Sequence, residues 1–214
     1  MQIKLYLSLS LCLQRILKKL ILNDTKRVET FFQQFNILTN NEIADFVQNS
    51  TLKVIKKDDF FIRQGEACRE VAFIVNGIFR SFYISDKGEE ITYCITFPSN
   101  LITAYSSFIT GSSTSENIQA ICDVELLVVP KYIIDDFSNK NPNWVKFLKV
   151  IAEQQYIELE KRIFQLQKSN ALQRYSDLIN NQPEYLRKIP LQYLASYLGI
   201  TQRHLSRIRK EISF

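Results

Sequence analysis

The sequence predicts an α+β protein in which an N-terminal antiparallel β-barrel or jelly roll is followed by a long helix and a C-terminal helix-turn-helix domain. Three observations predict it: short strand-like runs between residues 52 and 129, an apolar repeat of helical period from residue 143, and a two-helix motif from Leu191. The 214 residues, 46% of them hydrophobic, can bury the cores of two modest domains. We expect an N-terminal extension helix (1–24), a barrel domain with flanking helices (25–141), the long helix (142–168) and the helix-turn-helix domain (169–214).

Residues 1–24 combine a basic flank with the apolar run LYLSLSLCL and are predicted to form an amphipathic helix. The run is short and lacks the small-residue cleavage site of a signal peptide, and no stretch of the chain reaches the roughly 20 apolar residues of a membrane span. The four cysteines are too widely spaced for a C-x-x-C metal site or a disulfide scaffold. Reduced thiols and a cytoplasmic location are therefore expected, with no bound metal.

The barrel domain begins with short helices between Thr25 and Gln48, with Thr39 and Asn40 as a break and a cap. Its strands are predicted at runs rich in β-branched and aromatic residues. These runs are 52–55, 60–63, 71–75, 78–84, 90–97, 117–121 and 125–129. Turn-forming residues, among them Gly65 and Gly77, separate the runs, as is typical of an antiparallel sandwich or jelly roll.

The long helix carries an apolar stripe whose members follow one another by threes and fours. They are Val145, Leu148, Ala152, Tyr156, Leu159, Ile163 and Leu166. Further apolar side chains lie off the stripe, so the helix is expected to bury one face against its own barrel and the other against a second copy of the chain. A helix packed wholly inside one chain is the alternative.

The segment from Leu191 to Arg209 has the residue pattern of a helix-turn-helix. Apolar residues at 194, 198, 200, 205 and 208 can hold two short helices together, and Ala195 is small where the helices approach. Gly199 lies at the turn, where a left-handed backbone favours glycine, and Thr201 is placed to cap the second helix. An ordinary helical hairpin is the competing interpretation.

The exposed face of the second helix favours DNA binding over that hairpin, because its side chains can donate hydrogen bonds to bases or phosphates. The predicted DNA-binding residues are Thr201, Gln202, Arg203, His204, Ser206, Arg207, Arg209 and Lys210. Residues 170–214 carry a net charge of +4, which suits a polyanionic partner. The start of the helix should reach bases first, while Arg209 and Lys210 are expected to contact phosphates. His204, the single histidine, is expected to face DNA and to have no catalytic role.

The order of strand-rich domain, long helix and helix-turn-helix resembles the Crp/Fnr family of bacterial transcription regulators. Two stretches carry the resemblance: FIRQGEACREVAFIVNGIFRSFY at 61–83 and ASYLGITQRHLSRIRK at 195–210. The resemblance implies a cyclic-nucleotide-binding-type barrel and a homodimer that reads a near-palindromic operator in the major groove of double-stranded DNA. It places the base-reading residues at Gln202, Arg203 and Arg207, and it allows RNA polymerase as a further partner.

The barrel departs from the family members that bind cyclic nucleotides, which carry a Gly-Glu pair and a later Arg-Ser or Arg-Thr pair. Here Thr103-Ala104 stands where Gly-Glu would fall, and residues 100–120 contain no arginine. A buried phosphate without a cationic partner would be costly. We therefore expect no cofactor and no tight cyclic nucleotide binding, so that regulation is effector-independent or uses another effector.

Other functions are less well supported. A metal enzyme on such a barrel would need several histidines, and no Ser/His/Asp set, P-loop or G-x-G-x-x-G is present, so the protein is not expected to be an enzyme. The scattered cysteines argue against an iron-sulphur cluster. The short stretch after the second helix leaves little room for a β-hairpin wing, so we expect fewer phosphate contacts there. A small-molecule sensor or a protein-interaction module on the same barrel stays open as the alternative.

Overall fold

The computed structural model describes residues 25–212, and the predicted extension helix at 1–24 lies outside them. Residues 25–33 are helical, and α2 (Asn40–Gln48) follows. Thr39 begins α2 with a reciprocal cap: its hydroxyl accepts the N–H of Glu42 at 3.4 Å, and the Glu42 carboxylate accepts the N–H of Thr39 at 2.6 Å. The predicted break and cap are thus confirmed.

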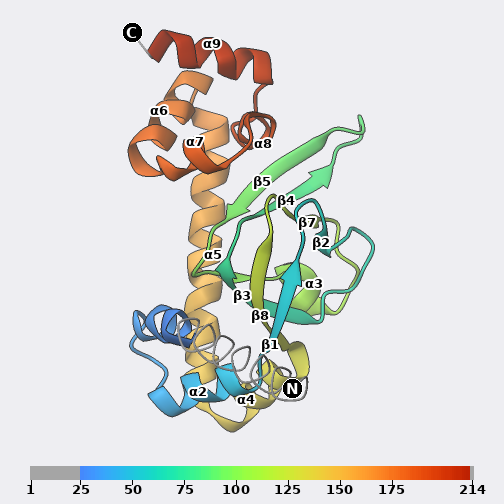
Figure 1. Ribbon diagram of the computed structural model, residues 1–214, viewed down its shortest axis with the longest axis vertical. Coiled ribbons are helices and arrows are strands. Elements are labelled where there is room, and N and C mark those ends of the chain that lie inside the picture. Colours follow the sequence, from blue (N-terminus) through green and yellow to red (C-terminus); the bar gives the residue numbers. More distant parts are fainter. Residues whose placement is uncertain (1–24, 213–214) are drawn as a thin grey trace, which may run out of the picture.

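The barrel consists of two four-stranded antiparallel sheets, with strand orders β1-β8-β3-β6 and β2-β7-β4-β5 (Figure 1). Its strands are β1 (Thr51–Ile55), β2 (Phe60–Ile62), β3 (Glu70–Asn76), β4 (Phe79–Ile84), β5 (Glu90–Thr96), β6 (Leu101–Ile102), β7 (Asn117–Ala120) and β8 (Val124–Pro130). The jelly-roll prediction is confirmed, and every predicted run lies on a strand. Within the barrel, β6 and the six-residue helix α3 (Tyr105–Thr110) were not predicted, because both are too short to show a period.

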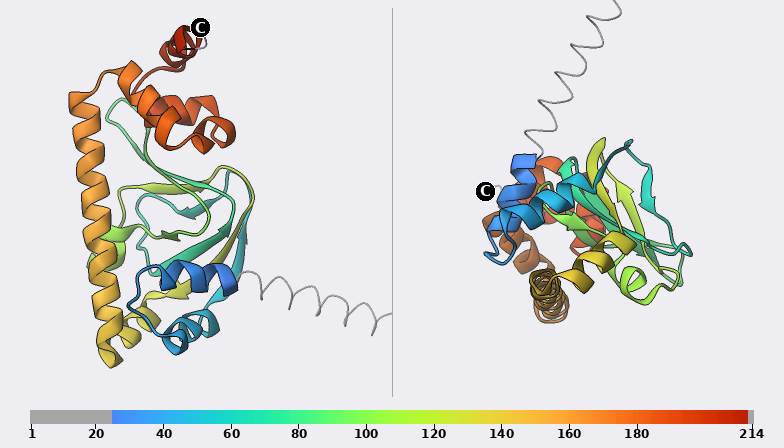
Figure 2. Two further views of the ribbon diagram at one scale, coloured as in Figure 1. Left: turned by 90° about the vertical axis from the view of Figure 1, so that its left-hand side faces the viewer. Right: turned by 90° about the horizontal axis from the view of Figure 1, so that it is seen from below.

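An aromatic core joins the barrel to the helices around it. The ring of Phe32 lies 4.9 Å from that of Phe46 and 5.1 Å from that of Phe147, and Trp144 packs beside them. Phe147 and Trp144 belong to the first turns of α5 (Pro142–Lys168), which follows α4 (Lys131–Lys140). The start of α5 is therefore fixed to the barrel, and the helix runs along the whole side of the molecule (Figure 2).

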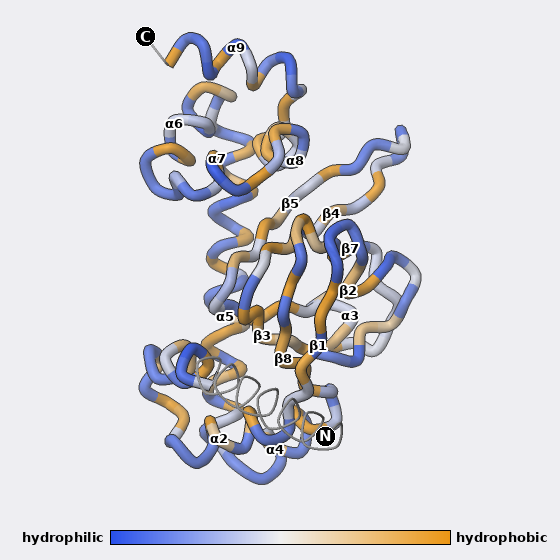
Figure 3. The backbone as a smooth tube through the Cα atoms, in the orientation of Figure 1, coloured by the Kyte–Doolittle hydropathy of each residue, from blue (hydrophilic) through white to orange (hydrophobic). Residues whose placement is uncertain are grey.

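The C-terminal part of the chain is helical, with a second apolar core. It contains α6 (Ala171–Asn181), α7 (Glu184–Lys188), α8 (Leu191–Tyr197) and α9 (Gln202–Ile212). Barrel residues Ile78, Ile95 and Ile121 belong to the same core, so this domain packs against one end of the barrel. Hydrophilic residues predominate along α9, with apolar ones at intervals, which is the pattern of an amphipathic helix (Figure 3). None of the helices within residues 25–212 is long and apolar enough to cross a bilayer.

Candidate nucleic-acid interface

The turn between α8 and α9 is closed by backbone hydrogen bonds. Gly199 has a φ of +66°, its N–H donates to the Ser196 carbonyl at 3.0 Å, and the N–H of Ile200 donates to the Ala195 carbonyl at 3.0 Å. This pairing ends α8 in a Schellman motif, for which glycine is the least strained residue. Thr201 then caps α9, because its hydroxyl accepts the N–H of His204 at 3.2 Å. The sequence pattern predicted both the turn and the cap.

One face of α9 packs inward. Leu205 and Ile208 are buried, with exposed fractions of 0% and 3%, and they share a core with Leu194, Ala195 and Leu198 of α8. The predicted helix pair is therefore held together by the predicted apolar residues. Because this core fixes the rotation of α9 about its own axis, it also fixes which side chains face outward.

The outward face carries the predicted DNA-binding side chains. Thr201, Gln202, Arg203, His204, Arg207, Arg209 and Lys210 are exposed, and Ser206 is half-buried. Successive helix residues are about 100° apart around the axis, so Arg203, Arg207 and Lys210 form a ridge opposite Leu205 and Ile208. In the part of the chain that the structure describes, none of these three cations forms a salt bridge. The α9 helix lies at the end of the molecule far from α2 and α4, with open space beyond it (Figure 1).

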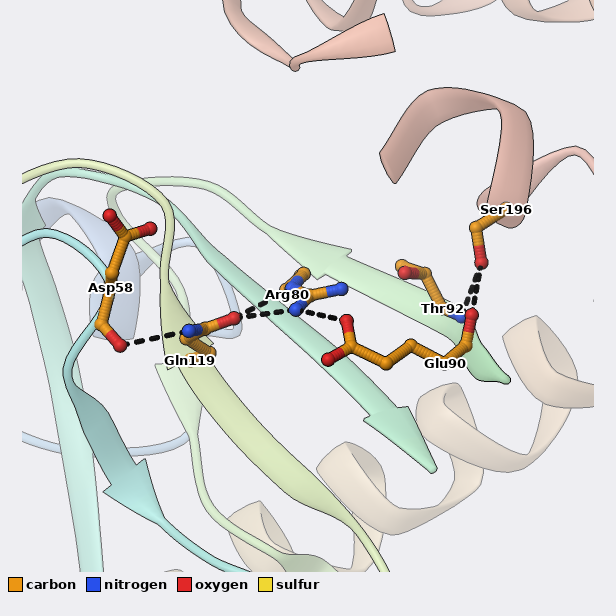
Figure 4. Close-up of polar contacts among 6 residues, drawn as sticks. All are labelled: Asp58, Arg80, Glu90, Thr92, Gln119 and Ser196. Carbon is orange, nitrogen blue, oxygen red and sulfur yellow. Dashed lines mark hydrogen bonds and ion pairs between the residues drawn. The ribbon is translucent and has the colours of Figure 1, made fainter. Parts of the chain in front are cut away.

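A junction between β5 and α8 positions this helix pair on the barrel. The Ser196 hydroxyl accepts the N–H of Thr92 and donates to the carbonyl of Glu90, both at 2.9 Å (Figure 4). Beside it, buried Arg80 donates to Gln119 at 2.6 Å and to the Glu90 carboxylate at 2.5 Å. Side chains from the barrel and from α8 thus meet in one polar network.

Two further arginines tie the other side of the turn to the long helix. Arg174, 8% exposed, donates from Nε to the Leu198 carbonyl at 2.9 Å and from Nη1 to the Ser169 carbonyl. Arg162 of α5 donates to the Tyr197 carbonyl and lies 3.9 Å from the centre of the Tyr197 ring. Both satisfy carbonyls at the end of α8 that the helix leaves without partners. No sequence pattern indicated these two roles, and Arg174 contributes to the net charge of residues 170–214 although its side chain is buried.

Most of the predicted stripe on α5 is exposed in the single chain. Val145, Tyr156, Leu159, Ile163 and Leu166 have exposed fractions between 41% and 67%. Leu148 and Ala152 are half-buried, and Leu148 packs against the barrel core. Of the apolar residues off the stripe, Phe147 is buried whereas Ile157 and Phe164 are exposed. The second half of α5 therefore presents a broad apolar surface that no other part of residues 25–212 covers.

Comparison with known proteins identifies this arrangement. The family model described as "Cyclic nucleotide-binding domain" matches residues 52–141. The curated anaerobic regulatory protein of Haemophilus influenzae is 23% identical over 167 residues, which are 73% of this chain and 64% of that protein. A solved structure described as a Crp/Fnr-family transcriptional regulator, from Eubacterium rectale, has a TM-score of 0.66 at 20% identity, over 86% of this chain and 88% of that one. Residues 52–141 thus form a cyclic-nucleotide-binding-type domain, and the whole chain shares the fold of the solved Crp/Fnr-family regulator.

A second solved structure has a similar fold. FixK2 from Bradyrhizobium japonicum has a TM-score of 0.68 at 17% identity, and the match covers 77% of this chain and 84% of that one. None of these three names describes an enzyme. The chain spans 64% of the length of the curated relative, less than two thirds.

The barrel borders a cavity of about 520 Å³ between its strands, α3 and α5. Among its lining residues are Thr103, Tyr105, Tyr93 and Glu116, and no described lining residue is a lysine, arginine or histidine. A cyclic nucleotide would bring a phosphate into this space without a cation to pair with it. The residues present therefore do not fit that ligand. Within residues 25–212 there is also no group of three or more His, Cys, Asp or Glu side chains that could hold a metal ion.

Proposed function

We infer that the protein is a DNA-binding transcription regulator of the cytoplasm. It acts as a homodimer that inserts α9 of each copy into the major groove of a near-palindromic operator. The observation that supports this most strongly is the outward face of α9. Three cations and several amide or hydroxyl groups stand opposite the core contacts of Leu205 and Ile208, where a duplex can reach them.

The side chains have different roles in this proposal. Gln202, Arg203 and Arg207 read bases, because amide and guanidinium groups can bond two atoms of one base edge. Thr201, at the capped start of the helix, holds a phosphate oxygen with its backbone N–H, and Lys210 meets the phosphates at the other end. Ser206 and His204 lie beside these residues and can contact either base or backbone.

The exposed stripe of α5 supports the homodimer. A second copy of the helix would cover Tyr156, Leu159 and Ile163, which are large, apolar and exposed in one chain alone. The two α9 helices would then meet successive major grooves about 34 Å apart, one turn of B-form DNA. In this proposal the pairing of the two α5 helices sets the distance between the two half-sites.

The test is selection of binding sites from random duplexes with the full chain. We expect a near-palindrome with half-sites one DNA turn apart, bound far more tightly than unrelated duplexes, with an affinity that falls steeply as salt rises. Arg203→Ala should relax the selected preference at one base position, whereas Arg63→Ala, which removes the same charge from the barrel, should leave the selected sequence unchanged. Equal affinity for every duplex, or an affinity that is insensitive to salt, would contradict the proposal.

A further inference from the structure

The cavity between the barrel and α5 has largely apolar walls. Phe31, Phe35, Leu101, Ile151 and Leu159 are among the side chains that line it. Its volume of about 520 Å³ is in the range of small-molecule binding sites. Burial of an apolar body in this space would be favourable, because it removes apolar surface from water.

One charged side chain lines this cavity in the described part of the chain, and it is acidic. Glu116 lies just before β7, and its Oε2 accepts a hydrogen bond from the hydroxyl of Tyr93 on β5. Among residues 25–212 no donor reaches the other carboxylate oxygen, Oε1. Burial raises the pKa of Glu116, while the Tyr93 hydrogen bond acts in the opposite direction. A ligand that donates to Oε1 would complete the hydrogen bonding of this carboxylate.

We propose that the cavity binds a small organic amine whose apolar body packs among the aromatic and aliphatic walls and whose protonated nitrogen donates to Glu116. The negative charge of Glu116 is the basis for this choice. A cationic nitrogen gains a charge-assisted hydrogen bond inside a poorly solvated space, whereas an anion would meet Glu116 without any lining cation. The ligand class is thus opposite in charge to the nucleotides that the family model is described by.

Three probes with one phenyl body and different charge test the proposal on the full chain. Phenethylamine is the cation, 2-phenylacetamide is neutral and phenylacetate is the anion, and cyclic AMP is a fourth arm. Trp144 is the only tryptophan of the chain and lines the cavity, so its fluorescence reports occupancy without interference from the probes. Isothermal titration gives the same affinities independently. No arm contains DNA, so a failure here leaves the proposed DNA binding untouched.

We expect phenethylamine to bind about tenfold or more tightly than phenylacetate, with the amide between them. Glu116→Gln should weaken phenethylamine about tenfold and leave the amide nearly unchanged, because the new side chain still accepts from Tyr93 but carries no charge. Glu153→Gln is the matched control: it removes one carboxylate from the exposed surface of α5, outside the lining, and should change neither affinity. Thermal unfolding of both variants checks that they fold.

Several results would overturn the proposal. Phenylacetate or cyclic AMP binding as tightly as phenethylamine would show that the site does not select against anions. An equal loss of phenethylamine affinity in Glu153→Gln would assign the effect to general surface charge. No saturable response to any of the probes at millimolar concentration would show that the cavity does not take a ligand of this class.

Discussion

The guanidinium carbon of Arg80, on β4, lies 3.9 Å from the centre of the Tyr193 ring on α8. The same guanidinium lies 4.0 Å from the ring of Phe82, so it is held between an aromatic side chain of the barrel and one of the helix-turn-helix domain. Arg80 is only 3% exposed and also bonds Glu90 and Gln119. A cation stacked and hydrogen-bonded in this way fixes the position of α8 more firmly than an exposed ion pair could.

Ser196→Ala should loosen this junction. The change removes the hydroxyl that bridges the Thr92 N–H and the Glu90 carbonyl, and Thr92 is buried, so its N–H loses a partner that water cannot easily replace. We expect a loss of about 1–3 kcal/mol in the free energy of unfolding and faster amide exchange at Thr92. Urea unfolding and hydrogen exchange measure the two effects. Ser206→Ala, on the outward side of α9, should stay within about 0.5 kcal/mol of the parent, and an equal loss there would contradict the assignment.

Arg203→Ala and Lys210→Ala should weaken DNA binding in different ways. Arg203 lies near the start of α9, where we propose base contacts, so its loss should cost about 1–3 kcal/mol on the selected operator and relax the preference at one base position. Lys210 is proposed to contact a phosphate. Lys210→Ala should therefore weaken binding to all sequences alike and reduce the slope of log affinity against log salt concentration by about one. Titrations of operator and scrambled duplex at several salt concentrations separate the two. If both variants lost affinity uniformly, Arg203 would be a phosphate contact.

Ile163→Glu should convert the proposed dimer into monomers. Ile163 is 44% exposed on the α5 stripe and, unlike Leu159, does not line the cavity. A carboxylate there would be buried without a partner in a helix pair, at a cost large enough to separate the copies. Light scattering gives the mass, and binding to a single half-site should survive better than binding to the full palindrome. Glu160→Lys is the control off the stripe, and a dimer that persists in Ile163→Glu would exclude this face as the interface.

The sequence allowed the strands and the helix pair to be predicted because both have local signatures. Period-two runs between turn residues mark the strands, and the α8–α9 turn needs Gly199 and Thr201 at fixed places. The exposed positions on α9 also followed from the helical period. Elements without a period escaped prediction, as β6 and α3 show.

The buried arginines could not be predicted from the sequence either. Arg80 and Arg174 are buried and Arg162 is half-buried, yet all three have the same side chain as the surface residues Arg203 and Arg207, and only partners distant in the sequence draw them inward. Arg80 meets Gln119 and Tyr193, while Arg174 meets Leu198. Such long-range pairings carry no local pattern. The cavity and the Glu116 carboxylate that lines it were unpredicted for the same reason.

The stability of the protein should fall in acid partly through Glu42. Burial raises the pKa of this carboxyl, but hydrogen bonds from Thr39, Asn143 and Asn141 outweigh it and hold the pKa below the ordinary value of 4.5. A carboxyl with a lowered folded pKa stabilises the native state above its unfolded pKa, and that stabilisation disappears as the pH falls through the folded value. Glu42→Gln should therefore be less stable than the parent near pH 7 and lose less on acidification. Melting curves from neutral pH to about pH 3 test this, and parallel pH profiles would contradict it.

Gly77→Ala should be far more damaging than Gly88→Ala, although both glycines have positive φ values. At Gly77, between β3 and β4, φ is +90° and an added Cβ would lie 2.5 Å from the Asp123 carbonyl oxygen and 2.7 Å from Val124 Cα. At Gly88 φ is +77° and nothing lies within 4 Å. Placing alanine at a positive φ costs about 1–2 kcal/mol in both variants. The difference between their losses of stability therefore measures the overlap of the new Cβ at position 77 with backbone atoms that cannot move aside. In chemical unfolding, we expect Gly77→Ala to lose about 1–3 kcal/mol more than Gly88→Ala in the free energy of unfolding. Equal losses would mean that the backbone at Asp123 and Val124 yields, and that the close approach of the β3–β4 and β7–β8 connections is not fixed by the missing side chain.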